Sequence, residues 1–335
     1  MDINENVLGK RPLVSIMIPA YQAEKFIDRC LNSVIKQTYN SLEILVYNDG
    51  STDGTQAIIS EYQKRDKRIV SMGSPNNCGL GVARNRMVLA ARGDYYSFVD
   101  ADDYVEPEFI EKLLSSVMEN HTEISICNYL VDKNSEIVSI ENGYRGVMNW
   151  KEFREEILTE RCSSYLWNKL FASQLFHNNL FKEDIVWEDL EWFGRCVFSN
   201  CVGKVSFVKE ALYYYVENLE SIVHKQEKLM FKSQCIAYAF LVRYKLAKRE
   251  RDRHLIDITL SQLVPRVLSY MTYKKYIADN GVQEYDAEIN NILGVLNVKE
   301  VLSMKYLSLG GKLQYMLYVV NTELFLKLKK RHLGI

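Results

Sequence analysis

The chain has 335 residues and a formal net charge of −1, and 47% of its residues are hydrophobic and 12% aromatic. This composition excludes an intrinsically disordered chain, and the length favours about two domains of ~150 residues. The near-neutral charge argues against a nucleic-acid partner, which would require a basic surface. Seven cysteines are scattered without a Cys-x-x-Cys pair, so we expect reduced thiols rather than a disulfide framework or a zinc site.

The sequence shows no targeting segment. Residues 1–11 are polar, and nowhere do ~18 consecutive apolar residues occur, the length needed to span a bilayer. We therefore expect a cytoplasmic protein.

Short apolar runs alternate with helical patterns along the first half of the chain. The predicted strands are 13–18, 42–47, 68–72, 95–99 and 124–131, and the predicted helices are 24–37, 55–65, 80–91 and 107–118. Short buried strands separated by helices predict an α/β fold with a mainly parallel sheet and helices on both faces. Ligands of such sheets bind at the carboxyl ends of the strands.

Polar segments follow three of these strands. Pro19-Ala20-Tyr21 ends the first, residues 48–53 (Asn-Asp-Gly-Ser-Thr-Asp) end the second, and Asp100-Ala101-Asp102-Asp103 ends the fourth. Carboxylates this crowded repel one another unless a cation lies among them, and a divalent cation with a diphosphate is the expected partner. The alternatives are an acidic solvated loop for the last segment and, for the second, a plain turn in which Thr52 or Asp53 caps the next helix.

One more segment, residues 77–85, lies between the second and fourth strand ends. In chain order it is the third of four segments, and residues 100–103 are the fourth. The glycines of residues 77–85, Gly79 and Gly81, allow close backbone approach, and the planar guanidinium of Arg84 is suited to a diphosphate. The segment is neither Gly-x-Gly-x-x-Gly nor a Walker loop, which disfavours dinucleotide-binding and P-loop enzymes.

Together these four ordered segments, over roughly residues 12–220, resemble family 2 glycosyltransferases of the GT-A fold. The resemblance implies a Rossmann-like catalytic domain that binds a nucleotide-sugar, usually with uridine as the nucleoside. Asn48 departs from the Asp that many relatives carry at its position. The resemblance implies that the nucleotide-binding residues are Pro19, Tyr21, Asp49, Arg84, Asp100 and Ala101. Among them, Pro19, Tyr21 and Asp49 would hold the nucleoside, Arg84 would lie near the diphosphate and Asp100 would contact the ribose. Asp102 of the DXD motif would bind Mn²⁺ or Mg²⁺.

Inverting sugar transfer also requires a base that removes the proton of the acceptor hydroxyl. Residues 186–193 place the pair Glu188-Asp189 among aromatic side chains, and in the family the Asp of such a pair, at the start of a helix, is the base. We therefore expect Asp189 to be catalytic, with a pKa raised by desolvation beside Trp187 and Trp192. The alternative is that both acids only stabilise a helix N-terminus.

Glu188 is also a candidate for a donor, acceptor or lid contact, as are three further positions, Trp167, Lys169 and His224. Trp167 and Lys169 lie in a Trp-Asn-Lys segment that resembles one beside the donor sugar or acceptor, although Trp167 could be a core residue and Lys169 a surface charge. His224 falls where some relatives bring a loop over the diphosphate, although a lone histidine is more often structural. Residues 132–158 have weak patterning and are expected to form an acceptor-side loop.

The chain is expected to divide near residue 225. Residues 1–225 would form the catalytic domain, with a nucleotide-sugar half at about 12–131 and an acceptor half at 132–225. Residues 226–335 would form a helical extension with helices at 228–248, 255–276, 286–296 and 313–328. This extension would pack on the catalytic domain, contact the acceptor or form a homodimer.

The predicted last helix is amphipathic and basic. From Lys305 onward the chain has six Lys or Arg residues against one acid, Glu323. Such a helix can lie on an anionic membrane face, in peripheral contact with it. The alternative is a helix packed on its own domain with a solvated basic edge.

The expected function is that of a metal-dependent, inverting hexosyltransferase. The resemblance implies transfer of a hexose or N-acetylhexosamine from a UDP-sugar to a glycan hydroxyl. The acceptor would be lipid-linked in many cases, in bacterial capsule, exopolysaccharide or surface oligosaccharide synthesis. Two alternatives are a nucleotidyltransferase that makes the sugar nucleotide and a non-catalytic module that binds it.

Overall fold

The computed structural model describes residues 11–133, 136–141, 143–199, 203–218, 228–277, 283–296 and 298–334. The chain divides into two units. Unit 1 comprises Met1–Trp150, Tyr165–Glu183 and Asn200–Asn218, and unit 2 comprises Lys151–Ser164, Asp184–Ser199 and Leu219–Ile335. This division differs from the single boundary expected near residue 225, because two earlier segments belong with the C-terminal helices.

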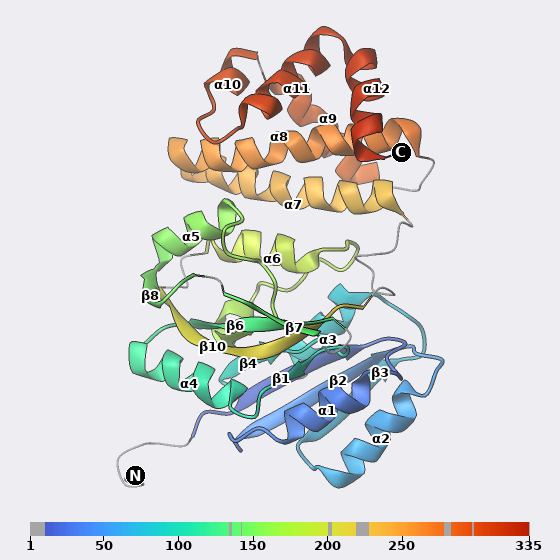
Figure 1. Cartoon of the computed structure of the whole chain (residues 1–335), viewed down its shortest axis with the longest axis vertical. Coiled ribbons are helices and arrows are strands. Elements are labelled where there is room, and N and C mark those ends of the chain that lie inside the picture. The colour runs from blue at the N-terminus through green and yellow to red at the C-terminus, as the bar shows by residue number, and fades with distance from the viewer. Residues whose placement is uncertain are drawn as a thin grey trace. The chain divides into compact units, whose positions relative to one another are not determined.

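Unit 1 is built on a ten-stranded sheet with the order β3-β2-β1-β4-β9-β6-β10-β5, and β7 and β8 pair with β6 and β10 (Figure 1). The pairs β1–β2, β2–β3, β1–β4 and β6–β10 are parallel. The antiparallel strand β9 lies between β4 and β6. The strands are β1 Val14–Ala20, β2 Leu42–Asp49, β3 Ile69–Ser74, β4 Tyr95–Phe98, β5 Tyr104–Val105, β6 Ile124–Lys133, β7 Glu136–Ile140, β8 Gly146–Asn149, β9 Lys169–Ala172 and β10 Lys204–Val216.

Helices cover both faces of this sheet, as expected from the sequence (Figure 1). The helices of unit 1 are α1 Ile27–Ile35, α2 Thr55–Arg65, α3 Leu80–Ala90 and α4 Phe109–Asn120. Alternate residues of β1 and β2 form one hydrophobic core with α1, α2 and α4, while α3 lies on the opposite face. Because both faces are covered, β2 is buried along its whole length.

The strands and helices predicted in the first half are found close to their expected bounds, and α2 coincides with its predicted range. Residues 132–158, expected as a loop, instead include the end of β6, the strands β7 and β8, and the helix α5 (Trp150–Leu158). The strands β7 and β8 are exposed at most positions. They therefore lack the apolar run by which buried strands are recognised in a sequence.

Unit 2 is helical and is built around α7 and α8, which pack against each other. Its helices after α5 are α6 Glu188–Cys196, α7 Leu229–Glu250, α8 Arg253–Tyr276, α9 Gln283–Val295, α10 Val298–Ser303, α11 Leu309–Val320 and α12 Thr322–Leu333. The earlier segments α5 and α6 join this unit through buried contacts. The buried guanidinium of Arg243, on α7, donates hydrogen bonds to Leu190 O at 3.1 Å and to Ser164 Oγ at 3.1 Å.

The single helix expected at 313–328 is two helices, α11 and α12. Asn321 ends the first, where its N–H donates to Leu317 O at 2.8 Å, and caps the second, where its Oδ1 accepts from the N–H of Leu324 at 3.0 Å. The apolar spacing alone continues across this position, which is why the break was not predicted. Among the described residues, no helix combines the length and apolar character needed to cross a membrane.

Candidate functional site

The ends of β1 and β2 lie side by side at one edge of the sheet. The register pairs Pro19 with Tyr47 and Ala20 with Asn48. Beyond the strands, Gln22 links the two segments, since its N–H donates to Ser51 Oγ at 2.9 Å and its Oε1 accepts from the N–H of Thr52 at 2.8 Å. The first two sequence segments therefore form one surface at the carboxyl edge of the sheet.

Asp49 is the last residue of β2 and is buried. Its two carboxylate oxygens accept hydrogen bonds from the N–H groups of Cys78 and Gly79, each at 2.9 Å. Asp49 therefore fixes the third segment against the second, a structural role that the sequence did not reveal. Its expected contact with a nucleoside base stays a prediction.

Gly50 is needed for the close approach of the same two segments. Its φ is +73°, and a Cβ built there would lie 2.4 Å from the carbonyl carbon of Asn76. Any other residue would be strained by its backbone conformation and would also clash with this loop.

The helix-capping alternative for Asp53 is wrong, because the N-cap of α2 is Gly54 and no side chain caps that helix. Asp53 instead connects two neighbouring segments. Its Oδ1 accepts from the N–H of Thr55, the first residue of α2, at 3.1 Å, and its Oδ2 accepts from the N–H of Glu24 at 3.1 Å. Asp53 therefore belongs to the framework of the edge.

Arg84, on α3, joins the third segment to the fourth. Its buried guanidinium lies 3.4 Å from Oδ1 of Asp100 and lies over the rings of Phe98 and Phe181, 5.9 Å from each ring centre. The neighbouring Asn85 is held by the backbone of Phe181. The N–H of Phe181 donates to Oδ1 of Asn85 at 2.8 Å, and Nδ2 of Asn85 donates to the carbonyl oxygen of Phe181 at 2.9 Å. These contacts hold α3 in a fixed position beside the acidic segment.

Gly81, where the sequence predicts a close backbone approach, lies against the backbone of another segment of the same chain. A Cβ at this position would lie 2.5 Å from Lys182 O. The first turn of α3 therefore packs directly on the backbone of residues 182–183, which follows β9 in the sequence.

The acids of the fourth segment lie in different environments. The side chain of Asp100 is 31% exposed and Asp102 is partly exposed, with its Oδ2 accepting from Nδ2 of Asn218 at 3.1 Å. Asp103 is buried and accepts from the hydroxyl of Tyr213 at 2.6 Å and the N–H of Val216 at 2.8 Å, both on β10. Burial, together with the charges of Asp102 and Asp100, raises the pKa of Asp103 well above its ordinary value.

These differences decide which acids can bind a metal. Mg²⁺ is usually held by one or two carboxylates together with waters and substrate phosphates. Asp102 and Asp100 suit this arrangement because both are partly exposed, whereas both oxygens of Asp103 already accept hydrogen bonds. Within the described ranges, no group of three His, Cys, Asp or Glu residues forms a complete metal cage, so a cation here would complete its shell with ligand oxygens and water.

The expected nucleoside contacts at the end of β1 lie at the same edge. Tyr21, directly after β1, is 52% exposed, and Pro19 is partly exposed. Ala101 is buried between the two partly exposed acids. Their predicted ligand contacts stay predictions.

A second polar cluster, not predicted from the sequence, supports the acidic segment. Asp132, near the end of β6, accepts from Arg29 Nη1 at 3.2 Å and from the hydroxyl of Tyr104 at 3.1 Å. Arg29 also lies over the ring of Tyr104, 4.3 Å from its centre. Burial, with the charge of Asp132 second, raises the pKa of Tyr104 to about 12, so its hydroxyl stays protonated and donates. These residues are far apart in the sequence, so only the folded chain reveals the cluster.

The Trp-Asn-Lys segment lies within unit 1. Trp167 is buried and stacks on Tyr165, Tyr213 and Tyr215 with ring centres 4.8, 5.0 and 5.6 Å away, which confirms that it belongs to the core. Lys169 begins β9 and is fully buried, so the alternative of a surface charge is wrong. Its Nζ donates to Asn168 Oδ1 at 3.0 Å. Contact of either residue with a donor sugar stays a prediction.

The candidate base belongs to unit 2. Glu188 and Asp189 are the first two residues of α6, where acids favour the helix N-terminus. Glu188 is buried and Asp189 is partly exposed, and Trp192 is fully buried in the same helix. The catalytic role of Asp189 and its raised pKa stay predictions, and His224 lies outside the described residues.

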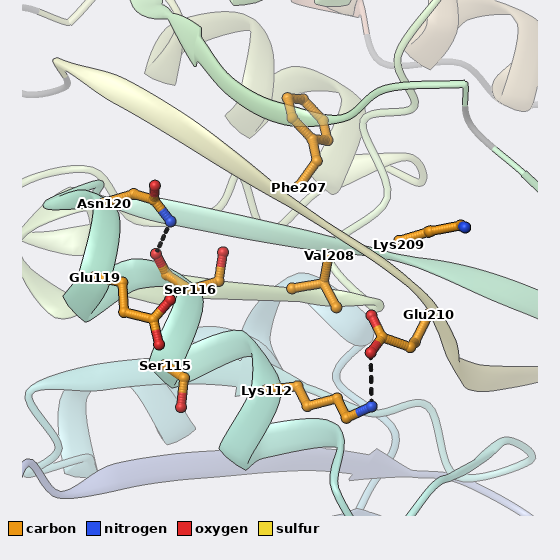
Figure 2. A pocket seen from close by; sticks show the side chains of 9 residues that line it. All are labelled: Lys112, Ser115, Ser116, Glu119, Asn120, Phe207, Val208, Lys209 and Glu210. Atoms are coloured by element: carbon orange, nitrogen blue, oxygen red, sulfur yellow. Dashed lines mark hydrogen bonds and ion pairs between the residues drawn. The ribbon is translucent and has the colours of Figure 1, made fainter.

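A pocket of about 310 Å³ in unit 1 is separate from this edge (Figure 2). It lies between α4 and the first half of β10, near the end where β10 and β6 begin. Lys112 and Glu210 line it and pair at 2.7 Å, and Ser116 and Asn120 contribute polar groups. Because the candidate site is at the opposite ends of the parallel strands, we assign this pocket no part in it.

Comparisons with known proteins agree with the expected fold and family. The model of the family "Glycosyl transferase family 2" matches residues 15–181. EpsH of Bacillus subtilis (strain 168), named as a glycosyltransferase, is 30% identical over 233 residues, which are 68% of this chain and 67% of that protein. The hyaluronan synthase of Pasteurella multocida is 37% identical over 161 residues, 48% of this chain but only 16% of the synthase.

Among solved structures, the chain is similar to S. aureus TarS 1-349 in complex with UDP-GlcNAc. The TM-score is 0.73 at 17% sequence identity, and the match covers 96% of this chain and 92% of that chain. At this identity the likeness concerns the fold alone. It includes both the sheet and the C-terminal helices.

Proposed function

The chain belongs to glycosyl transferase family 2, and on that premise we propose that it is a metal-dependent, inverting hexosyltransferase. It transfers a hexose or N-acetylhexosamine from a UDP-sugar to a hydroxyl group of a glycan. The product is a bacterial capsule, exopolysaccharide or surface oligosaccharide. The similarity to a hyaluronan synthase supports the polysaccharide assignment, and the likeness to TarS, solved with UDP-GlcNAc, supports UDP as the nucleotide.

One observation carries the proposal: hydrogen bonds and one ion pair connect all four polar segments at a single sheet edge. Gln22 links the first segment to the second, Asp49 links the second to the third, and Arg84 links the third to the fourth. A nucleoside diphosphate needs a base site, a cation and a positive side chain near its phosphates. These connected segments supply candidates for each.

In the proposed reaction, this chain's residues hold the donor and accept one proton. Pro19, Tyr21 and Asp49 bind the nucleoside, and Asp100 contacts the ribose. A bound Mn²⁺ or Mg²⁺, held by Asp102, would neutralise charge on the diphosphate leaving group. Arg84 supports this region through its contact with Asp100.

The acceptor hydroxyl oxygen attacks the anomeric carbon while the bond from that carbon to the diphosphate oxygen breaks, and UDP leaves. Asp189 takes the hydroxyl proton as the new bond forms, a contribution of about 10²- to 10⁴-fold in rate. This role requires the carboxylate to come within hydrogen-bond reach of the acceptor hydroxyl. A partly exposed position at the start of α6 is compatible with that requirement.

The acceptor is proposed to be lipid-linked and the enzyme to act at the cytoplasmic face of the membrane. The six described cysteines are all free, five of them buried. Reduced thiols are typical of the cytosol. The basic end of the chain would provide the peripheral membrane contact.

The test is release of UDP from a panel of UDP-sugars, with Mn²⁺, with Mg²⁺ and with EDTA. The wild type should release UDP slowly from at least one sugar without acceptor, and only with a divalent cation. Asp102→Ala should lose this activity, whereas Glu61→Gln, an exposed acid on α2 paired with Lys64, should keep it. Full activity of Asp102→Ala, or release of pyrophosphate from UTP and a sugar phosphate instead, would contradict the proposal.

The variant Asp189→Asn distinguishes the role of Asp189 as a base from any role in binding the donor. We expect this variant to bind UDP with wild-type affinity and to lose transfer to a glycan by about 10²-fold or more. Transfer is measured with radiolabelled donor and a panel of oligosaccharide acceptors. Wild-type transfer by this variant would exclude Asp189 as the base.

A further inference from the structure

We propose that α11 and α12 in unit 2 form a docking surface for an anionic lipid bilayer. The surface, called here the α11–α12 face, consists of Leu309, Leu313, Val320, Leu324 and Leu328 with Lys312, Lys327 and Arg331. The inference deepens the proposed function, on which it rests for the lipid-linked acceptor, because it names the protein surface that brings the enzyme to the acceptor's membrane.

The apolar part of this face is exposed although it is made of large aliphatic side chains. Leu309 is 74% exposed and Val320 is 80% exposed, and Leu313, Leu324 and Leu328 are also exposed. The spacing of residues 309, 313 and 320 places them on one side of α11, and 324 and 328 lie on one side of α12. Scattered single leucines are ordinary on a surface, but exposed aliphatic residues repeated along one side of each of two consecutive helices mark an interaction site.

The opposite sides of the same helices pack into unit 2. Tyr315 of α11 and Phe325 and Leu326 of α12 are buried in the core of that unit. The hydroxyl of Tyr315 donates to Leu296 O at 2.9 Å, and both helices pack on α8 (Figure 1). The fold of these helices therefore does not depend on the exposed stripe, which can be changed without removing a core residue.

Cations flank the exposed stripe. Lys312 and Lys327 lie one turn or less from exposed leucines, and Arg331 lies three residues after Leu328, on its side of α12. In the part of the chain that the structure describes, Lys312 and Arg331 form no salt bridge. The one acid of this region, Glu323, is already bound by Lys275 of α8.

Two other basic residues of α12 are turned toward the protein and are not part of the face. Lys329 donates to Gln314 Oε1 at 3.1 Å, and burial lowers its pKa. Lys330 lies over the ring of Tyr276, 4.5 Å from its centre. The cations of the face are therefore those beside the exposed aliphatic residues.

This combination of aliphatic and cationic groups favours an anionic bilayer over a second copy of the chain. In a two-fold dimer the same patch meets itself, so cations would approach cations without acidic residues to balance them. An anionic bilayer takes aliphatic side chains at the boundary of its acyl chains and lysine or arginine at its phosphate groups. The occupant that matches both properties is the surface of a membrane rich in anionic lipid.

The experiment is co-sedimentation of the full chain with sucrose-loaded vesicles. One set of vesicles contains phosphatidylglycerol and phosphatidylcholine in equal amounts, and the other contains phosphatidylcholine alone. We expect the wild type to bind the anionic vesicles about tenfold or more tightly than the neutral ones, and added salt should weaken this binding. No binding of the wild type to the anionic vesicles would overturn the proposal.

Two double variants test the two parts of the face. Leu313→Glu with Val320→Glu, and separately Lys312→Glu with Arg331→Glu, should each weaken binding to anionic vesicles by about tenfold or more. The matched control is Leu89→Glu, which changes a leucine that is 66% exposed on α3 of unit 1 and should leave vesicle binding unchanged. Wild-type binding by both double variants, with circular dichroism spectra matching the wild type, would overturn the proposal.

Two further readouts separate this proposal from its rivals. If the wild type is a dimer in solution and the Leu313→Glu, Val320→Glu variant is a monomer, the face binds a second copy and the membrane proposal is wrong.

UDP release from the UDP-sugar, measured without vesicles, should be the same in both double variants and the wild type. A chain that binds anionic vesicles but releases no UDP would uphold the docking surface and overturn the proposed function, and the reverse result would do the opposite.

Discussion

Adjacent aspartates in the fourth segment differ in burial and in their hydrogen-bond partners. The sequence was sufficient to locate the acidic cluster after a strand and to predict a cation beside it. It could not show that Asp103 faces β10 while Asp102 remains accessible, since the partners of Asp103, Tyr213 and Val216, lie more than a hundred residues later. Asp49 is a second example. Its partners, the N–H groups of Cys78 and Gly79, lie in a segment recognised in the sequence only by its glycines, and the contact with Asp49 was not predicted.

Asp103→Ala should lower the free energy of unfolding by about 1–3 kcal/mol, because it leaves the buried hydroxyl of Tyr213 and the N–H of Val216 without their acceptor. Urea denaturation followed by circular dichroism measures the loss. The control is Glu61→Ala, an exposed carboxylate whose removal should change stability by no more than about 0.5 kcal/mol. Equal effects of the two substitutions would show that the buried contacts of Asp103 contribute nothing to stability.

Gly50→Ala should destabilise unit 1 by more than about 1 kcal/mol, since the position has a positive φ and its Cβ would overlap the backbone of Asn76. The loop that contains Cys78 and Gly79 would have to shift, so we expect weaker UDP binding as well. Thermal unfolding and UDP titration measure the two effects. Gly294→Ala in α9, where a Cβ meets nothing within 4 Å, should leave both unchanged or slightly raise the melting temperature; similar behaviour of the two variants would contradict this reading of Gly50.

At the scale of elements, long periodic segments were predictable and short or exposed ones were not. The strands β1 and β2 and the helices α1 to α4 follow their apolar patterns. The strand β9 has only four residues and begins with a buried lysine, Lys169, so local preference gives no hint of it. The antiparallel position of β9 between β4 and β6 depends on contacts with distant residues, which periodicity does not encode.

The turn between α2 and β3 carries an ion pair that should make stability depend on pH. Arg68 binds Asp66 through Nη2 to Oδ2 at 2.6 Å, and the hydrogen bond from Arg68 lowers the pKa of the Asp66 carboxyl. A carboxyl whose pKa is lower in the folded state stabilises the fold above its unfolded pKa, and this contribution is lost as the pH falls through the folded value.

Asp66→Asn should therefore be less stable than the wild type at pH 7, and the difference should shrink as the pH is lowered below about 4, the usual range of a free Asp. Urea titrations at a series of pH values measure it. Glu61→Gln on the neighbouring helix provides the exposed-acid comparison. A difference that stays constant from pH 7 to pH 3 would exclude this ion pair as its source.

At the scale of the whole molecule, the order of motifs along the chain predicted the family, whereas the division into units was not predictable. The segments with α5 and α6 precede β10 in sequence but pack with the C-terminal helices, as the hydrogen bonds of Arg243 show. Arg243 is an arginine in a long helix, and nothing in its neighbourhood along the chain indicates that it is buried. Such contacts between distant segments determine unit boundaries, and a single sequence does not display them.

The account depends most on the claim that the connected edge of the sheet binds a nucleoside diphosphate through a cation held by Asp102. Calorimetric titration of the full chain with UDP, with Mn²⁺ and with EDTA, tests it directly in the wild type, Asp102→Asn and Asp189→Asn. We predict that Mn²⁺ tightens UDP binding by about tenfold or more in the wild type, equivalent to ~1.4 kcal/mol, that Asp102→Asn loses this gain, and that Asp189→Asn retains it. UDP binding of equal strength with and without Mn²⁺, or an undiminished metal effect in Asp102→Asn, would contradict the claim.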